Sequence, residues 1–316
     1  SSGDEDADFI EQALGFTDSS KSSESVLSLQ VENIAGASFG SYGVKGISLS
    51  KDSHYLYITD SSQKNIKIVD IDSKTQFLFF AGDNTFSGVR GICSHGGNEQ
   101  SVFVALSAHN KIVEIRHESP NKAESVYINS FSGVCGGSYK PYDIIHDHPN
   151  NFLYVLCGKS NGGSIRRIDT TGGALPVTLL SSLGSAEPQN WAVVHGENGV
   201  IEGAYVTNYK SSYMTAKVQK ISFANSGISE VFADGLLRHP RGVAISSDQN
   251  KLYVQERTFK GIVGGKRRDS NSAWKQTPFT KGKILPDFPI GIVYRNKKLY
   301  SVHREDHGSI HVVDVE

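Results

Sequence analysis

Apolar and polar positions alternate along most of this chain with the period of two that is typical of β-strands. One short pattern recurs six times: a large or charged residue, then usually a glycine, then an aliphatic residue. The copies are Lys45-Gly46-Ile47, Arg90-Gly91-Ile92, Tyr142-Asp143-Ile144, Trp191-Ala192-Val193, Arg241-Gly242-Val243 and Ile290-Gly291-Ile292. Their central residues are 45 to 52 positions apart, and a repeat of this period predicts an array of similar supersecondary units.

Each copy is followed by three more strand-like segments. The second segment of each repeat carries an aromatic residue at one fixed register, and the third alternates β-branched with polar residues. The aromatic residues are Tyr57, Phe103, Tyr154, Tyr205, Tyr253 and Tyr300. Four strands in each of six repeats predict an all-β fold: a six-bladed β-propeller of four-stranded antiparallel blades.

The two ends of the chain predict how the ring closes. The last repeat stops after its third strand, whereas a spare strand, Gln30–Gly36, lies near the start and shares an Ala-Gly ending with Phe77–Gly82. We therefore predict that a segment of about residues 26–36 completes the last blade and removes an open strand edge. The propeller would then span residues 25–316. Residues 1–24 form an acidic, Ser-rich extension, either a short amphipathic helix or a disordered tail.

Composition gives no global electrostatic reason to expect a charged partner. The chain has 32 Lys and Arg against 33 Asp and Glu, so attraction to nucleic acid or a membrane surface must come from a local patch. The longest apolar runs are about 4 to 8 residues, too short to span a bilayer.

The chain begins Ser1-Ser2-Gly3, as expected of a processed or trimmed chain. The compartment stays open between a secreted or surface location after signal removal and the cytoplasm.

Three cysteines, Cys93, Cys135 and Cys157, leave two states open. An odd number excludes complete pairing within the chain, and the spacings match no zinc or CxxC pattern. The alternatives are three buried apolar cysteines, which we expect, and one disulfide with a free thiol.

The first repeat, residues 44–71, resembles an NHL repeat. It has a Gly-Ile strand, a turn, a Tyr-Ile-Thr-Asp strand and an Asn-Ile-Lys-Ile-Val-Asp strand, and residues 161–169 and 240–256 resemble parts of the same pattern. The resemblance implies a propeller but no single function. Similar propellers include RNA-binding modules, protein-interaction domains, calcium-dependent lactonases and amidating lyases.

The resemblance also implies where a binding surface would form. In such propellers the first strands line the central channel, and their starts share one face, the top, with the ends of the second strands. The residues that we predict to bind a partner at this top mouth are Lys45, Arg90, Tyr142, Trp191, Arg241, Glu256, His303 and Arg304. Cations beside aromatic rings can hold an anionic small molecule, an acidic peptide or a nucleotide base. The alternative is that these charges pair among themselves, for instance Arg241 with Glu256.

A calcium-dependent hydrolase is a more specific alternative to partner binding at the top mouth. Related lactonases place Asn, Asp and Glu oxygens around a calcium ion at this mouth, and oxygen ligands suit that ion. In this chain the set would be Asp60, Asp143, Asn208 and Glu256. One departure opposes this alternative, because Arg241 stands where the lactonase segment carries a ligand Asn.

Four histidines fall at the opposite ends of the first strands: His95, His146, His148 and His195. His146 and His148 would lie on one side of a strand, a spacing that suits a metal. No Cys or Glu joins them at metal-site spacing, so we predict turn histidines that are solvated or bonded to backbone. The chain also lacks a nucleophile elbow, a P-loop and a GxGxxG motif.

We therefore predict a non-enzymatic, monomeric interaction propeller with no catalytic residue, metal or cofactor. Among possible partners we rank a protein or peptide first, a small anionic ligand second and RNA third. The alternatives are the calcium-dependent hydrolase of lactonase type and an RNA-binding propeller of NHL type. A basic and aromatic stretch, Lys260–Lys283, is either a site for an acidic partner or a solvated outer strand and loop.

Overall fold

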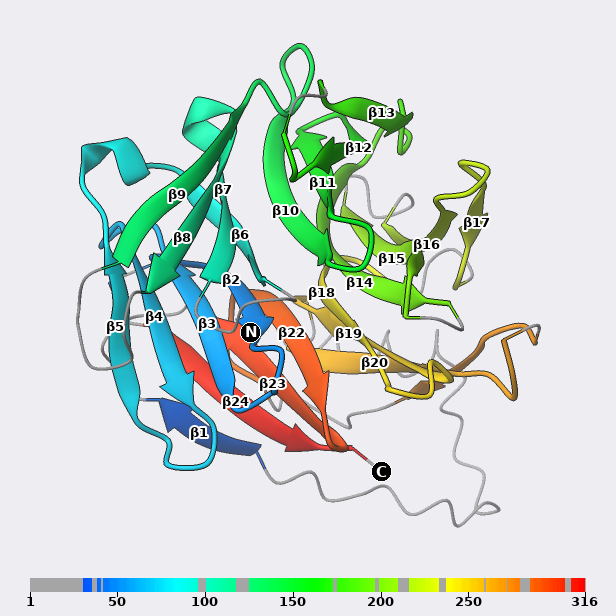
Figure 1. Cartoon of the computed structure of the whole chain (residues 1–316). Helices are drawn as coiled ribbons and strands as arrows, with labels where there is room; N and C mark the ends of the chain where they lie inside the picture. The colour runs from blue at the N-terminus through cyan, green and yellow to red at the C-terminus, as the bar shows by residue number, and fades with distance from the viewer. Residues whose placement is uncertain are drawn as a thin grey trace.

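Six four-stranded antiparallel sheets surround a central channel in the computed structural model of the chain (Figure 1), which confirms the predicted six-bladed β-propeller. The structure describes residues 31–35, 39–40, 42–95, 101–117, 125–172, 175–196, 199–209, 216–232, 237–258, 260–270, 272–278, 285–304 and 308–315. The predicted N-terminal extension lies outside these residues. No helix in the described part of the chain has the length and apolar character that crossing a membrane requires.

The first three blades follow one another along the chain. Blade 1 consists of β2 (Val44–Leu49), β3 (Tyr55–Asp60), β4 (Asn65–Asp70) and β5 (Gln76–Ala81). Blade 2 consists of β6 (Val89–Ser94), β7 (Ser101–Leu106), β8 (Lys111–His117) and β9 (Ser125–Ser132). Blade 3 consists of β10 (Lys140–Asp147), β11 (Phe152–Lys159), β12 (Gly162–Asp169) and β13 (Val177–Leu180). Two short 3-10 helices, η1 (Asn84–Phe86) and η2 (Ser107–His109), lie in the connections of the first two blades.

The other three blades continue the ring. Blade 4 consists of β14 (Glu187–His195), β15 (Ile201–Tyr209), β16 (Lys217–Ser222) and β17 (Ile228–Glu230). Blade 5 consists of β18 (Pro240–Ile245), β19 (Lys251–Glu256), β20 (Gly261–Lys266) and β21 (Lys275–Pro278). Blade 6 consists of β22 (Pro289–Arg295), β23 (Lys298–His303), β24 (Ser309–Asp314) and β1 (Val31–Ala35).

The N-terminal strand closes the ring, as predicted. β1 lies antiparallel to β24 with Val31 opposite Val313 and Ala35 opposite Ile310. The fourth strand of blade 6 thus comes from the opposite end of the chain, and Figure 1 shows the blue β1 beside the red β24. This pairing ties the two ends of the chain together and leaves β24 without an open edge.

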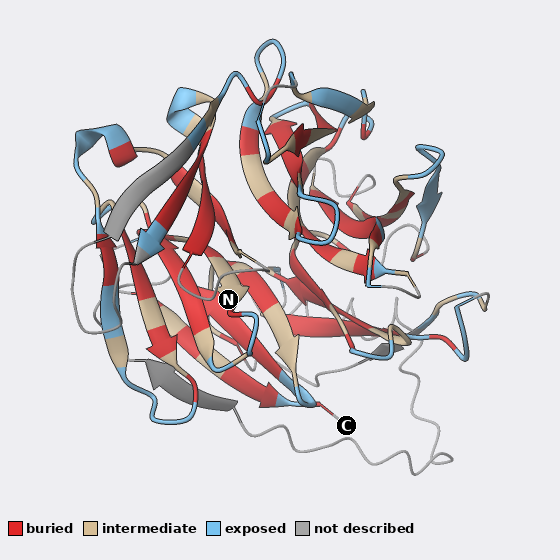
Figure 2. Ribbon diagram, in the orientation of Figure 1, coloured by how far each residue is buried: buried red, intermediate tan, exposed pale blue. Residues whose placement is uncertain are grey.

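The apolar core lies between blades, because each sheet is covered on both faces by its neighbours. The second strands are buried along almost their whole length, and Figure 2 shows them in red. One core cluster joins Val44, Leu56 and Ile58 of blade 1 to Val302 and Ile310 of blade 6. Such contacts, repeated around the ring, supply the main stabilisation through apolar area removed from water.

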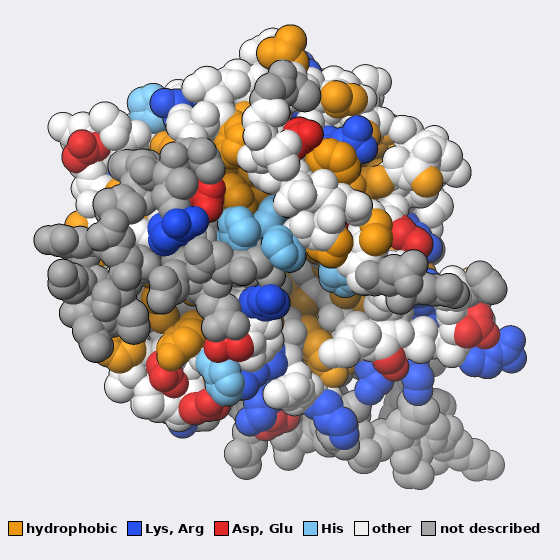
Figure 3. All heavy atoms as spheres, in the orientation of Figure 1, with side chains coloured by type: hydrophobic (Ala, Val, Ile, Leu, Met, Phe, Trp, Pro, Cys, Tyr) orange, Lys and Arg blue, Asp and Glu red, His pale blue; other side chains and the backbone are white. Residues whose placement is uncertain are grey.

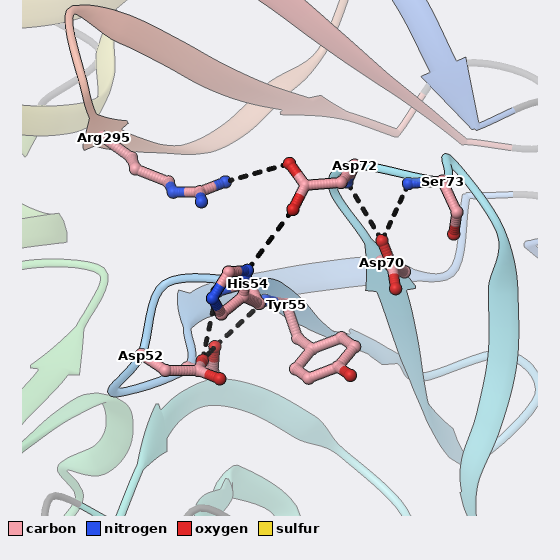
Figure 4. Close-up of polar contacts among 8 residues, drawn as sticks. Asp52, His54, Tyr55, Asp70, Asp72, Ser73 and Arg295 are labelled. Atoms are coloured by element: carbon pink, nitrogen blue, oxygen red, sulfur yellow. Dashed lines mark hydrogen bonds and ion pairs between the residues drawn. The ribbon is translucent and has the colours of Figure 1, made fainter.

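A polar network also joins blades 1 and 6 at the exposed turns (Figure 4). Asp72 lies 3.3 Å from Nδ1 of His54 and 4.0 Å from the guanidinium of Arg295. Asp72 itself is exposed, so water screens both interactions, and each contributes at most about 1 kcal/mol. Cohesion between the two blades therefore comes from the apolar cluster and not from these ion pairs.

The disulfide that the sequence left open is present. Cys135 and Cys157 are bonded, with their Cα atoms 5.8 Å apart, and Cys93 is a buried free cysteine. The expectation of three apolar cysteines was wrong, because the loop after β9 brings Cys135 against the end of β11. A disulfide between cysteines 22 positions apart in the sequence restricts the conformations that the unfolded chain can adopt.

Replacing both Cys135 and Cys157 with Ala should lower the free energy of unfolding by about 3 kcal/mol, the chain-entropy value for a loop of this length. Urea unfolding would measure the change. Cys93→Ala is the matched control, since it removes a buried thiol without removing a cross-link. Alkylation of the unfolded, unreduced chain should modify one thiol, and modification of all three would contradict the assignment.

Candidate functional site

The strand registers correct the sequence alignment of blade 4. Four first strands place a proline opposite a residue at or near the end of the second strand: Pro141 opposite Cys157, Pro188 opposite Asn208, Pro240 opposite Glu256 and Pro289 opposite His303. Counting from this proline, the mouth residue of blade 4 is Gln189 and not Trp191. Trp191 lies two residues farther along the channel, opposite Val206, where the other blades carry Ile or Val. The sequence prediction therefore placed Trp191 at the wrong level.

Cationic side chains gather at the top mouth, where the first strands start. The cations that influence one another there are Lys45, Arg90, Arg241, Arg257 and Arg304. Burial, and then the fields of the neighbouring arginines, lower the pKa of Lys45 to about 8. Burial and the field of Arg257 lower the pKa of Arg241 to about 10. Both shifts indicate concentrated positive charge, as expected of a site for anions.

Aromatic rings support these cations. The Arg90 guanidinium lies 3.5 Å from the ring centre of Tyr142, and the Arg257 guanidinium lies 4.2 Å from that of Phe288. Arg304 lies 5.6 Å from the Tyr42 ring. The structure thus brings together four of the predicted mouth residues, Lys45, Arg90, Arg241 and Arg304, with Tyr142. Their predicted role in binding a partner stays a prediction.

Two other predicted mouth residues hold the structure together. Glu256 is buried and accepts the backbone N–H groups of Arg238, His239 and Thr258. His303 is buried beside Ser301, with its Nε2 2.6 Å from the hydroxyl oxygen, and burial lowers its pKa to about 3. The suggested pairing of Arg241 with Glu256 is replaced by a hydrogen bond from Arg241 to Gln189.

The predicted calcium ligands are not assembled. Asp60 accepts the backbone N–H groups of Gly40, Ser62 and Gln63, and Glu256 is similarly occupied by its own loop. Asn208 donates to Gln219. Within the described residues, the three acids of the set do not form a cluster that could hold an ion. The set Asp60, Asp143, Asn208 and Glu256 therefore does not fit calcium, and only Asp143 reaches the channel.

Below the mouth the channel passes a narrow level. Four of the six equivalent positions are glycines: Gly46, Gly91, Gly242 and Gly291. A Cβ atom on Gly46 would lie 2.5 Å from the carbonyl oxygen of Arg90, so the first strands approach too closely there for a side chain. The two remaining positions carry Asp143 and Asn190, on neighbouring blades. These two side chains therefore stand where the other four blades have glycine.

Asp143 and Asn190 are held against each other. Nδ2 of Asn190 donates to Oδ2 of Asp143 at 2.9 Å, and Oδ1 of Asp143 accepts the N–H of Ile144 at 3.0 Å. Oδ1 of Asn190 accepts the N–H of Val243 at 3.3 Å, which fixes the orientation of the amide. Burial raises the pKa of Asp143 to about 7, although these hydrogen bonds and the field of Arg90 favour the ionised form.

A cavity of about 300 Å³ extends from this pair along the channel, away from the top mouth. Its apolar wall comes from all six first strands, at the level just beyond Asp143 and Asn190: Ile47, Ile92, Ile144, Trp191, Val243 and Ile292. His146 and His195 line its other end. The cavity thus combines one apolar level with polar groups at both ends, and a concave site that holds an acid of shifted pKa is a candidate small-molecule site.

Three of the four histidines at that end form a group, which the sequence prediction of solvated or backbone-bonded turn histidines did not include. His95, His146 and His148 lie together, and His95 and His146 are partly buried. Figure 3 shows histidine side chains gathered near the centre of the face in view. His195, on the next blade, instead has its Nδ1 3.2 Å from the carbonyl oxygen of Gly199.

The described part of the basic stretch 260–283 is integrated into blade 5. Arg267 is buried, lies 4.8 Å from the ring centre of Trp274 and donates to the carbonyl oxygens of Gln249 and Ser270. Lys260 pairs with Asp287 at 2.6 Å. The other described basic residues of the stretch are exposed: Lys266 lies opposite Lys275 on the neighbouring strand, and Arg268 lies beside Asp269.

Comparisons with known proteins show the fold alone. No family model matches the chain, and no curated protein matches it. A gluconolactonase structure from Xanthomonas campestris is similar, with 9% identity, a TM-score of 0.62 and coverage of 91% of this chain and 90% of that one. An aldose sugar dehydrogenase with bound PQQ from Streptomyces coelicolor has 14% identity, a TM-score of 0.64 and coverage of 91% and 98%. A luciferin-regenerating enzyme has 12% identity, a TM-score of 0.61 and coverage of 90% and 95%.

These neighbours correct our prediction of function. The similar propellers named above are enzymes, which contradicts the prediction of a non-enzymatic interaction module and favours the enzyme alternative. The coarser part of the family prediction holds, since the chain is a six-bladed propeller, but an NHL assignment is not supported. One neighbour carries a bound cofactor, so the expected absence of a cofactor stays a prediction.

Proposed function

We propose that this protein is a propeller hydrolase that opens a small lactone or ester bound in the central cavity, with Asp143 as general base. The position of Asp143 carries the proposal. Its carboxyl lines a cavity of about 300 Å³, and burial raises its pKa to about 7. A general base is most effective when its pKa lies near the working pH.

In the proposed reaction, the Asp143 carboxylate removes a proton from a water molecule as the water oxygen bonds to the carbonyl carbon. The carbonyl oxygen takes up the negative charge of the tetrahedral intermediate. When the bond from carbon to the ring oxygen breaks, the departing alkoxide takes the proton from Asp143. Water and lactone thus give a hydroxy acid, and Asp143 returns to its ionised state.

Asn190 and the mouth cations support this chemistry. The amide of Asn190, fixed by Val243, holds one carboxylate oxygen of Asp143 in place, so Asn190 is a positioning residue. Arg90 acts electrostatically on Asp143, and four other cations lie at the adjoining top mouth. Positive charge beside the cavity would stabilise the negative charge that develops in the transition state.

The fold comparison adds plausibility but no substrate. One neighbour is named a gluconolactonase, and the likeness of this chain to it is one of fold. Because the predicted calcium ligands do not converge, no step is assigned to calcium. We further propose an oxidising compartment, since a disulfide such as Cys135–Cys157 persists where glutathione does not reduce it.

The test is hydrolysis by the purified chain of five- and six-membered lactones and of 4-nitrophenyl acetate, at several pH values. Because the base must be ionised, kcat/KM should rise tenfold per pH unit and level off above about 7, the pKa of Asp143. A falling profile over this range would assign Asp143 as an acid instead. No turnover of any substrate above the buffer rate would overturn the proposal.

A further inference from the structure

The cavity reaches a group of three imidazoles through one of them, His146, and the proposed hydrolysis uses none of the three. His95 follows β6 of blade 2, whereas His146 and His148 lie at the end of β10 in blade 3. One ring nitrogen from each can be chosen so that all three lie within 4.8 Å of one another. The ring centres of His95 and His146 are 4.5 Å apart, and each is 5.8 Å from that of His148.

We infer that His95, His146 and His148 form a binding site for one transition-metal ion of the zinc class at this end of the cavity. Nitrogen atoms bonded to one tetrahedral zinc ion lie about 3.3 Å apart, because each Zn–N bond is about 2.0–2.1 Å long. Ring rotations that move each nitrogen atom by about one ångström would therefore bring the three nitrogens within bonding distance of one ion. Imidazole ligands suit Zn²⁺, Cu²⁺ and Ni²⁺, whereas Ca²⁺ and Mg²⁺ prefer oxygen.

The surroundings suit ligation in two ways. The ring of Phe103 stacks on His95 with centres 5.3 Å apart and lies 4.9 Å from His146, which restricts both imidazoles. The buried carboxylate of Glu114 lies 3.9 Å from Nε2 of His95. A carboxylate beside a ligating histidine orients the ring and raises its basicity, as is usual in the outer shell of metal sites.

Three protein ligands leave a fourth tetrahedral position for water, as in catalytic rather than structural zinc sites. Because His146 also lines the cavity, that position would be next to the cavity.

The experiment is Zn²⁺ binding by the tag-free, chelator-treated chain, followed by calorimetry and by competition with a chromophoric chelator. One Zn²⁺ per chain is expected. His148→Gln and His146→Gln should weaken binding at least about tenfold, and Glu114→Gln about 10- to 100-fold. His148 is exposed, so its replacement does not threaten the fold. Co²⁺ should give the intense visible absorption of a tetrahedral site in the wild type and lose it in His148→Gln.

The matched control is His195→Gln, which removes another histidine of the same cavity without touching the cluster. It should bind Zn²⁺ as the wild type does. The inference is overturned if the wild type binds no stoichiometric Zn²⁺, or if His146→Gln and His148→Gln bind it as tightly as His195→Gln. The readout is binding alone, so the outcome is independent of whether the chain hydrolyses lactones.

Discussion

Replacing Asp143 with Asn should lower kcat/KM for lactone hydrolysis about a thousandfold, within the range that general bases contribute. The amide cannot accept a proton from water, whereas its shape and volume are nearly those of the carboxyl group. The effect should appear mainly in kcat, because Asp143 acts on the water in the transition state and not on the bound substrate. Initial rates over a range of lactone concentrations would separate the two parameters.

The control for this variant is Asp147→Asn. Asp147 is a second carboxylate of β10, buried, but it accepts from Asn150 and does not line the cavity. Its neutralisation should leave kcat/KM within about twofold of the wild type, since it is not placed to contact substrate. Equal losses in both variants would mean that Asp143 acts through the local fold, and no loss in Asp143→Asn would exclude it as the base.

Stability gives a second check on Asp143→Asn. In the unfolded chain the carboxyl ionises near pH 3.9, whereas burial raises its folded pKa to about 7. Between these values the folded state holds a proton that the unfolded state has lost, so this term makes stability fall as pH rises. The amide in Asp143→Asn has no proton to lose, so the variant lacks this pH-dependent contribution. Because the amide has one oxygen in place of two, either the N–H of Ile144 or the amide of Asn190 loses its acceptor. The free energy of unfolding of the variant should therefore fall less between pH 4 and pH 8 than that of the wild type, and urea unfolding at both pH values would measure the difference.

The architecture could be predicted from the sequence because the repeat is regular where it builds the blades. A Gly-aliphatic first strand and an aromatic second strand recur at a period that only a closed array explains. Blade 4 was misread because Trp191-Ala192-Val193 looks like the other copies. Aligning Pro188 with Pro141, Pro240 and Pro289 would have placed Gln189 at the mouth and Asn190 at the narrow level.

The candidate site could be predicted only in part, because it depends on contacts between blades. Asp143 was named from the sequence as a candidate calcium ligand, whereas its partner Asn190 was hidden by the shifted register. The mouth cations Lys45, Arg90 and Arg241 followed from the repeat together with the strand placement that the family resemblance implies. His95 joins His146 across a blade boundary of 51 residues, and Cys135 meets Cys157 through a loop. No spacing rule within one strand contains such information.

A chain that begins at residue 37 should lose the native monomer, whereas one that begins at residue 25 should keep it. Only the first lacks β1, which pairs with β24 along Val31–Ala35. About four lost backbone hydrogen bonds cost about 4 kcal/mol at about 1 kcal/mol each. Ile310 and Val313 of β24, which are fully buried, would also lose a neighbouring strand. Together these losses should lower the melting temperature by about 10 °C or more.

The open edge left on β24 also predicts association, because an unpaired strand is a template for another chain. Size-exclusion chromatography with light scattering should show dimers or larger species for the shorter chain and monomers for the longer one. A synthetic peptide of residues 26–36 should restore the monomer and part of the melting temperature by occupying the same edge. If both chains melt alike as monomers, β1 does not hold the ring closed, and interblade apolar contacts such as those of Val44 with Ile310 suffice.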